Sequence, residues 1–153
     1  MTALTINHVT IPVRDFDESE QFFADILGAE RLISPNVGLP VRWLRVGDGQ
    51  IHLLHDDGGS RGLAHFGVTV DDLATVYERA RLRGALDPAV NGHHLWELPG
   101  GVVQLYLRDP SGNLIEVNAR DASALPEHVR ADVRAVADAH PQTAENLEAR
   151  LLS

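Results

Sequence analysis

Hydrophobic and polar residues alternate along two short segments of the chain that are nearly copies of each other. Residues 8–15, HVTIPVRD, align one by one with residues 65–72, HFGVTVDD. Every second residue is apolar, which is the period of a strand with one buried face. The opposite face of each segment begins with a histidine, His8 or His65, and continues with small or polar residues. The pattern predicts two equivalent strands, each with one face for a helix to cover and one face that lines a cavity.

Each predicted strand leads into a segment whose apolar residues have helical spacing. The first predicted helix ends at Gly28 and the second at Gly84, and glycine is typical of the residue that follows a helix. Aspartates that can cap the helices precede both: Asp15 or Asp17 for the first, Asp71 or Asp72 for the second.

Strands and turns follow both helices. Residues 41–55 predict one hairpin and residues 101–119 predict another, each with a turn rich in glycine and aspartate. The order β-α-β-β-β is therefore present twice, over residues 6–56 and 63–119. We predict a single α+β domain over residues 1–120.

The last part of the chain lies outside the repeat. Residues 126–140, PEHVRADVRAVADAH, predict a helix that begins near Pro126, carries an apolar stripe and ends before Pro141. We expect residues 121–153 to form a helical extension that packs against the sheet or a partner subunit. A mobile tail is the alternative, since chain ends are often poorly ordered.

Matching the two hairpins places His52 and Glu116 at equivalent positions, on the faces that carry His8 and His65. Two imidazoles and one carboxylate are the donor set of Fe(II) sites that activate oxygen. A glutamate in an otherwise apolar strand is costly to bury unless a cation compensates it. We therefore expect His8, His65 and Glu116 to bind a divalent metal. His52 is a fourth ligand, a nearby base or a cavity residue.

Three further side chains are candidates for catalysis. Tyr106 precedes Glu116 at an even spacing interrupted by the turn, and it could donate a phenolic hydrogen bond or form part of the cavity wall. His93 and His94 lie in a segment that should border the cavity. They are either acid–base groups or solvated loop histidines.

Composition narrows the class of function. The net charge of −9 disfavours nucleic acid and anionic membranes as partners, because both require clustered cations. The chain has no cysteine, which excludes disulfides and thiolate chemistry, and no lysine, which excludes Schiff bases. No apolar run has the length of a membrane span and no secretory leader is visible, so we expect a cytoplasmic protein.

Four segments together resemble the vicinal oxygen chelate superfamily: NHVTIPVRD, FFADILGAE, AHFGVTVDDL and YLRDPSGNLIEVN. This superfamily includes glyoxalase I, the fosfomycin and bleomycin resistance proteins, methylmalonyl-CoA epimerase and the extradiol dioxygenases. The resemblance covers residues 6–119. It implies two βαβββ modules that form an open, cupped β-barrel around a divalent metal, and a homodimer.

The resemblance also places individual residues. His8, His65 and Glu116 fall on the family's ligand positions. His52 falls where glyoxalase I has a glutamate and the epimerase a glutamine. Tyr106 precedes Glu116 at the spacing of the catalytic tyrosine in the dioxygenases, whose additional histidine could be His93 or His94.

Because the second carboxylate is missing, the resemblance favours an Fe(II)-dependent extradiol-type dioxygenase that acts on a small, catechol-like substrate. One alternative is an isomerase, epimerase or lyase of the glyoxalase type that uses nickel, zinc, manganese or cobalt. A second alternative, from another class, is a drug-binding resistance protein that makes no bonds and needs no metal.

Overall fold

The computed structural model describes residues 5–58, 62–149 and 151. The chain divides into two compact units, and each is described by itself. Unit 1 is formed by the residues up to Gly62 together with Asp109–Asn113, and unit 2 by Leu63–Arg108 and the residues from Leu114 onward.

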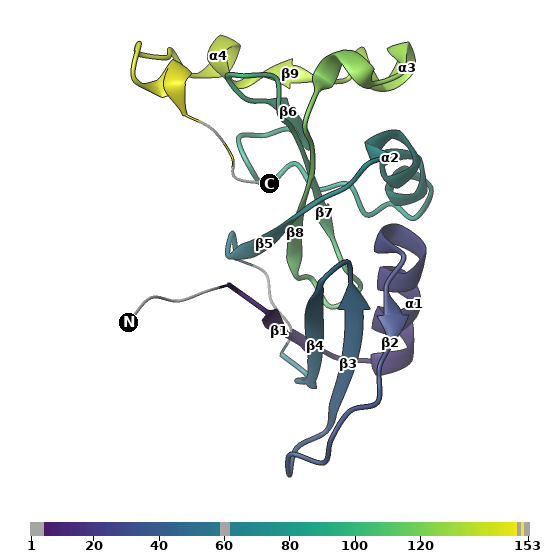
Figure 1. Ribbon diagram of the computed structural model, residues 1–153. Helices are drawn as coiled ribbons and strands as arrows, with labels where there is room; N and C mark the ends of the chain where they lie inside the picture. The colour runs from purple at the N-terminus through teal and green to yellow at the C-terminus, as the bar shows by residue number, and fades with distance from the viewer. Residues whose placement is uncertain (1–4, 59–61, 150, 152–153) are drawn as a thin grey trace. The chain divides into compact units, whose positions relative to one another are not determined.

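Unit 1 has the element order predicted for the first copy of the repeat. It contains β1 (His8–Val13), α1 (Phe16–Leu27), β2 (Glu30–Arg31), β3 (Val41–Val46) and β4 (Gly49–His55). The sheet order is β1-β4-β3-β2, with β1 parallel to β4 and the other pairs antiparallel (Figure 1). The βαβββ prediction is confirmed for this copy.

The boundaries and buried face of α1 follow from the residues at its ends and along one side. Asp15 caps the helix, since its Oδ1 accepts a hydrogen bond from the Glu18 backbone N–H at 2.8 Å. Gly28 ends it in the left-handed conformation, with φ of 65°. Phe22, Phe23 and Ile26 are buried. Together with the buried strand residues they form the core of this unit, and the other face of the sheet is left for polar residues.

Unit 2 repeats the arrangement. Its elements are β5 (His65–Thr69), α2 (Leu73–Leu82), β6 (Leu95–Glu97), β7 (Val103–Arg108) and β8 (Leu114–Ala119). Strand β5 is parallel to β8, and the sheet order is β5-β8-β7-β6-β9, where β9 (Arg134–Ala135) lies in the C-terminal extension. Asp72 caps α2, and every residue of β8 is buried. The βαβββ prediction is confirmed for the second copy as well.

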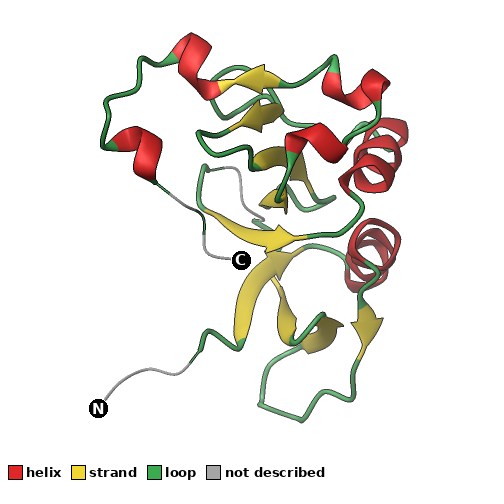
Figure 2. Cartoon of the chain, turned by 45° about the horizontal axis from the view of Figure 1, so that its top comes forward, coloured by secondary structure: helices red, strands yellow, loops and turns green. Residues whose placement is uncertain are grey.

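Residues 126–140 do not form the one continuous helix that their pattern predicts, and that expectation is wrong. The C-terminal extension contains η1 (Ala122–Ala124), α3 (Glu127–Arg130), β9 (Arg134–Ala135), α4 (Val136–Ala139) and η2 (Asn146–Glu148). Figure 2 shows short helical turns on both sides of the strand β9. Strand β9 pairs in parallel with β6, Trp96 opposite Arg134. The edge of β6 has backbone N–H and C=O groups that are free to pair with another segment, and a local helical pattern does not predict this pairing. Because β9 pairs there, the extension packs against the sheet of unit 2.

The turn between β7 and β8 belongs to unit 1. The Asp109 carboxylate accepts hydrogen bonds from the backbone of Ser111 and Asn113, at 2.9 and 2.8 Å. Burial raises the pKa of Asp109 even though these hydrogen bonds oppose it. The Asn113 side chain donates to the Pro12 carbonyl at 2.8 Å, and the Arg14 backbone N–H donates to Ser111. The sequence DPSGN is thus a structural turn that packs at the end of β1.

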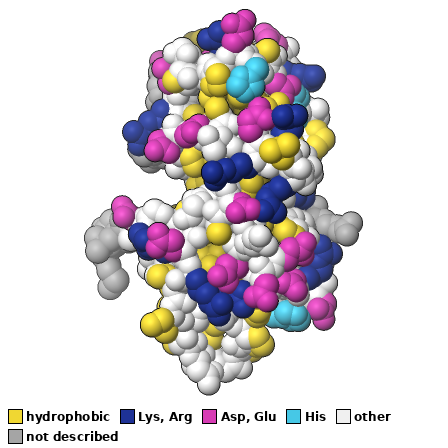
Figure 3. Space-filling model, turned by 90° about the vertical axis from the view of Figure 1, so that its right-hand side faces the viewer, with side chains coloured by type: hydrophobic (Ala, Val, Ile, Leu, Met, Phe, Trp, Pro, Cys, Tyr) yellow, Lys and Arg dark blue, Asp and Glu magenta, His cyan; other side chains and the backbone are white. Residues whose placement is uncertain are grey.

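Charged side chains of both signs are interspersed on the face that Figure 3 shows, with arginines beside acidic residues. On α2, Arg81 and Glu78 form an ion pair at 2.7 Å. Among the described residues, no helix combines the length and apolar character needed to cross a membrane.

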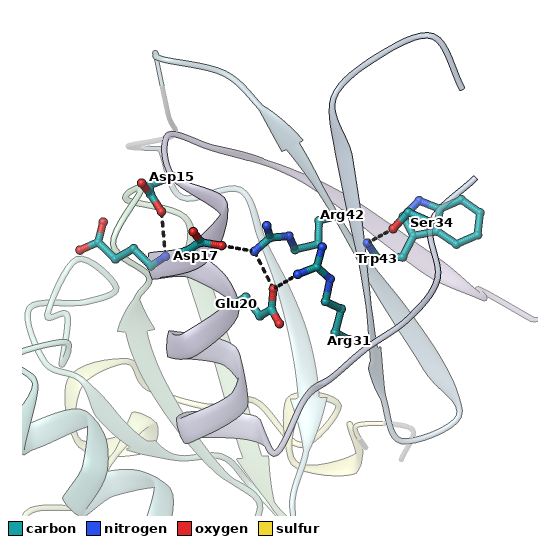
Figure 4. A network of polar contacts seen from close by, with 8 residues as sticks. Asp15, Asp17, Glu20, Arg31, Ser34, Arg42 and Trp43 are labelled. Carbon is teal, nitrogen blue, oxygen red and sulfur yellow. Dashed lines mark hydrogen bonds and ion pairs between the residues drawn. The ribbon is translucent and has the colours of Figure 1, made fainter. Parts of the chain in front are cut away.

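Arg42 connects β3 to α1 (Figure 4). Its Nη1 lies 2.7 Å from Asp17 Oδ1 and 2.6 Å from Glu20 Oε2, and its side chain is only 14% exposed. The neighbouring residue, Trp43, points away from α1 and donates its backbone N–H to Ser34 Oγ at 2.9 Å. Alternation along β3 therefore sends the charged network to the helix side and the indole ring to the face that carries the histidines.

Candidate functional site

Two of the predicted histidines lie side by side in unit 1. The rings of His8 on β1 and His52 on β4 are stacked, with centroids 4.2 Å apart and planes at 16°. Trp43, directly opposite His52 in the β3–β4 ladder, stacks on the other side of that ring at 4.2 Å and 2°. The His52 ring is therefore held between two aromatic neighbours, which restricts its orientation.

Hydrogen bonds determine which nitrogen of each ring carries a proton. His8 Nδ1 lies 2.6 Å from the Asn7 side-chain oxygen, which can only accept, so Nδ1 donates and Nε2 keeps its lone pair. His52 is arranged the other way, because its Nε2 lies 2.8 Å from Gln50 Oε1. Burial first, and the charge of His8 second, lower the pKa of His52. The neutral form of His52, with a basic Nδ1, is favoured.

In unit 2, His65 on β5 faces Glu116 on β8. His65 Nδ1 donates to the Leu63 carbonyl at 2.7 Å, which leaves the lone pair on Nε2. That nitrogen lies 3.3 Å from Glu116 Oε2. A neutral imidazole nitrogen and a carboxylate oxygen are both acceptors, so a proton or a cation must lie between them for the contact to be favourable.

Three neighbours lie beside the Glu116 carboxylate, which is buried, and two of them donate hydrogen bonds to it. Tyr106 donates its hydroxyl to Oε2 at 2.8 Å, and Asn118 donates its amide to Oε1 at 2.9 Å. Burial, with the hydrogen bond and charge of Glu116, raises the pKa of Tyr106 well above its ordinary value. The phenol therefore remains protonated and continues to donate.

The third neighbour is Gly67, opposite Glu116 in the β5–β8 ladder. A Cβ atom at this position would lie 3.3 Å from Glu116 Oε1 and 3.4 Å from Asn118 Nδ2. Neither Gly67 nor Asn118 was predicted as a site residue. Asn118 shares the alternation of Glu116 along β8, which is a signal that could have identified it.

The donor atoms fit a first-row divalent metal. Ligands held by bonds of about 2.0 to 2.2 Å lie roughly 3 Å apart, close to the separation of His65 Nε2 and Glu116 Oε2. Metal-binding histidines usually donate their other nitrogen to an oxygen of the protein, as His8 and His65 do. His52 departs from this arrangement, since its Nε2 is bound to Gln50. The ligand roles of all four residues stay predictions.

His93 and His94 form hydrogen bonds to Asp132, not to Glu116 or Tyr106. His94 Nε2 lies 2.7 Å from Asp132 Oδ2, and His93 Nε2 lies 2.7 Å from the Asp132 carbonyl oxygen. Asp132, in the C-terminal extension, was not predicted as part of any site. No local motif marks it, because only the packing of the extension brings it to the histidines.

Residues 5–117 match the model of the Glyoxalase/Bleomycin resistance protein/Dioxygenase superfamily. The chain belongs to this superfamily. A curated relative, mitochondrial methylmalonyl-CoA epimerase from Mus musculus, is 26% identical over 130 residues, covering 73% of this chain and 71% of the epimerase.

Solved structures of the superfamily agree in fold. A glyoxylase/bleomycin resistance protein/dioxygenase domain from Frankia sp. EAN1pec is 26% identical with a TM-score of 0.63, covering 78% of this chain and 99% of that one. The fosfomycin resistance protein FosX from Listeria monocytogenes is 18% identical with a TM-score of 0.60, covering 84% and 99%. The second likeness concerns the fold alone.

Proposed function

We propose that this protein is a divalent-metal-dependent isomerase or epimerase, which moves a proton on a carbon next to a carbonyl group. The observation that carries this is the pair His65 Nε2 and Glu116 Oε2, 3.3 Å apart, because a divalent cation between them satisfies both atoms. The name of the epimerase relative supports the class of reaction.

His8, His65 and Glu116 would hold the metal in this proposal. When bound, the metal would polarise the substrate carbonyl oxygen and stabilise negative charge on it. Tyr106 and Asn118 keep the Glu116 carboxylate in one orientation through their hydrogen bonds. Such neighbours of a metal ligand contribute to both metal affinity and activity.

His52 would be the group that moves the proton. The carbon–hydrogen bond breaks, its proton goes to Nδ1 of His52, and the electron pair moves to the carbonyl oxygen. Return of a proton to the carbon completes the isomerisation. The lowered pKa of His52 favours the neutral ring that can accept a proton near neutral pH. Stacking between His8 and Trp43 limits its rotation.

We propose an acyl thioester as the first substrate to test, because the epimerase relative is named for one. Cobalt-loaded protein is incubated with methylmalonyl-CoA in heavy water, and mass spectrometry records deuterium uptake. We expect uptake by the wild-type protein and a decrease of at least about 100-fold in His52→Gln. His55→Gln is the matched control, since His55 is another β4 histidine whose side chain is 43% exposed. Equal rates in the two variants, or no uptake across a panel of thioesters, would reject this role.

Tyr106→Phe tests the support of the carboxylate. We expect the metal affinity to fall by about 10- to 100-fold, because the hydrogen bond to Glu116 Oε2 is lost. Calorimetric titration against a competing chelator measures it. Thr75→Ala is the control, since it removes a hydroxyl–carboxylate hydrogen bond to a different residue, Asp72.

A second candidate is an Fe(II)-dependent extradiol-type dioxygenase acting on a catechol-like substrate. The hydrogen bond from Tyr106 to Glu116 and the presence of a single carboxylate among the proposed ligands favour it. Anaerobic reconstitution with Fe(II), followed by oxygen-uptake measurements with catechols, distinguishes it from proton transfer. Tight ligand binding by metal-free protein without turnover would contradict both candidates and favour a drug-binding role.

A further inference from the structure

His93, His94 and Asp132 form a cluster within unit 2 that the proposed reaction does not use. The histidines precede β6, and Asp132 lies between α3 and β9. One possible ligand atom from each residue lies within 4.8 Å of the others. The His93 and His94 rings are adjacent, with centroids 4.5 Å apart. Segments far apart in the sequence thus bring two imidazoles and a carboxylate together.

Three protons converge on Asp132. His94 Nε2–H and the Tyr77 hydroxyl donate to Oδ2, at 2.7 and 2.8 Å, and His93 Nε2–H donates to the backbone carbonyl. Asp132 Oδ1 lies 3.7 Å from His93 Nε2. His93 is buried, and the other two are half-buried. A divalent cation between the rings and the carboxylate would take the place of the two Nε2 protons. It would then interact with both imidazoles and the carboxylate, more strongly than the two hydrogen bonds do.

Tyr77 on α2 suits a supporting role for such a cation. Burial, followed by the hydrogen bond and charge of Asp132, raises its pKa to about 12, so its hydroxyl remains a donor. It would continue to donate to Oδ2 while Oδ1 faces His93. Hydrogen bonds of this kind orient metal-binding carboxylates.

We propose that His93, His94 and Asp132 form a second divalent-metal site, which takes a borderline ion of the Zn²⁺, Co²⁺ and Ni²⁺ class. Imidazole and carboxylate ligands suit these ions. The site is independent of the one proposed at Glu116, and its ion connects the C-terminal extension to the segment before β6. Each ring must present an Nε2 lone pair to the metal, so its proton moves to Nδ1 or is released.

Trp96 provides an internal reporter. Its indole N–H donates to the His93 carbonyl at 2.9 Å, and its ring lies 5.7 Å from the His93 ring. The chain has two tryptophans, so Trp43→Phe leaves Trp96 as the sole emitter. Adding Glu116→Gln to this background removes a ligand of the other proposed site. Full-length protein without a histidine tag is stripped of metal and titrated with Co²⁺, which quenches nearby indoles.

We expect one equivalent of Co²⁺ to quench Trp96 fluorescence, and Zn²⁺ to reverse the quenching by displacement. His94→Gln and Asp132→Asn should each weaken Co²⁺ binding more than tenfold. His128→Gln is the matched control, an imidazole on α3 whose ring lies 3.2 Å from Glu78 and is 62% exposed. It should bind as the parent does. Two variants are used so that poor folding of one, checked by circular dichroism, leaves the other informative.

Thermal unfolding gives a second readout. Zn²⁺ at a hundredfold excess over its Kd for the parent should raise the Tm of the parent by roughly 5 to 10 °C, and that of each variant by at most about half as much. Titration curves of both variants that superimpose on the parent curve, or quenching only at millimolar Co²⁺, would overturn the second site. Activity of the Glu116 site plays no part in either measurement, so the two proposals fail separately.

Discussion

His8 and His65 each donate a hydrogen bond through Nδ1 to an oxygen close by in the chain, Asn7 Oδ1 or the Leu63 carbonyl. This contact leaves Nε2 as the basic nitrogen in both copies of the repeat. His52 has the opposite arrangement because Gln50 lies on the same face of β4, two residues away. At the scale of single residues, the neighbours therefore leave Nε2 free of a proton in His8 and His65, and Nδ1 in His52.

Gly67→Ala tests the space beside the carboxylate. The added methyl would lie 3.3 Å from Glu116 Oε1, so either the carboxylate or β5 must shift by a few tenths of an ångström. We expect metal affinity to fall by about tenfold or more while the circular dichroism spectrum is kept. Gly49→Ala is the control, since its Cβ would make ordinary contacts, the nearest at 3.6 Å. Equal metal affinities in the two variants would contradict a steric role for Gly67.

At the scale of elements, the two helices begin alike. Asp72 caps α2 as Asp15 caps α1. It accepts two hydrogen bonds from Thr75: the backbone N–H donates to Oδ1 at 2.9 Å, and the hydroxyl donates to Oδ2 at 2.6 Å. These hydrogen bonds, the side-chain one first, lower the pKa of Asp72. A carboxyl with a lowered pKa stabilises the fold when ionised, so its contribution is present above the unfolded pKa of about 3.9 and is lost as the pH falls below it.

Asp72→Ala should lower the Tm by roughly 2 to 4 °C at neutral pH, because the cap is lost. The difference from wild type should shrink as the pH is lowered from about 5 to about 3, where the wild-type carboxyl becomes protonated. Calorimetric melting at several pH values measures it. Asp71→Ala, which keeps both hydrogen bonds of the cap, should melt like wild type throughout. A difference that stays constant with pH would count against an ionised cap.

At the scale of the whole molecule, the C-terminal extension belongs to unit 2 through several kinds of contact. Strand β9 adds to the edge of β6, Tyr77 on α2 donates to Asp132, and Val129 on α3 is fully buried. Backbone pairing, a polar cluster and apolar packing thus all attach the extension to unit 2. We therefore expect the extension to contribute to the stability of unit 2.

Val129→Ala should lower the free energy of unfolding by about 1 to 3 kcal/mol, through lost burial and the cavity left behind. Urea unfolding followed by circular dichroism measures it. Leu147→Ala is the comparison, because Leu147 lies in the same extension but is 51% exposed, and we expect a change within about 0.5 kcal/mol. A Val129 variant as stable as the Leu147 variant would show that α3 adds nothing to the stability of unit 2.

Much of the fold could be predicted from local patterns. Alternation in HVTIPVRD and HFGVTVDD indicated β1 and β5 together with their polar faces, and the glycines after Leu27 and Arg83 indicated where the helices end. Because the side-chain period of a strand is two, the same patterns placed His8, His52, His65 and Glu116 on the faces opposite the helices. These properties are local, so the order of residues is enough to determine them.

Contacts between distant segments were decided only by the tertiary structure. Pairing of β9 with the edge of β6 overrides the helical pattern of residues 126–140, and it carries Asp132 to His93 and His94. Similarly, the DPSGN turn is recognisable in the sequence, but its attachment to Pro12 and Arg14 is not. The physical reason is the same in both cases, because an unpaired strand edge or a buried carbonyl can be satisfied by any segment that reaches it, and only the folded chain determines which one does.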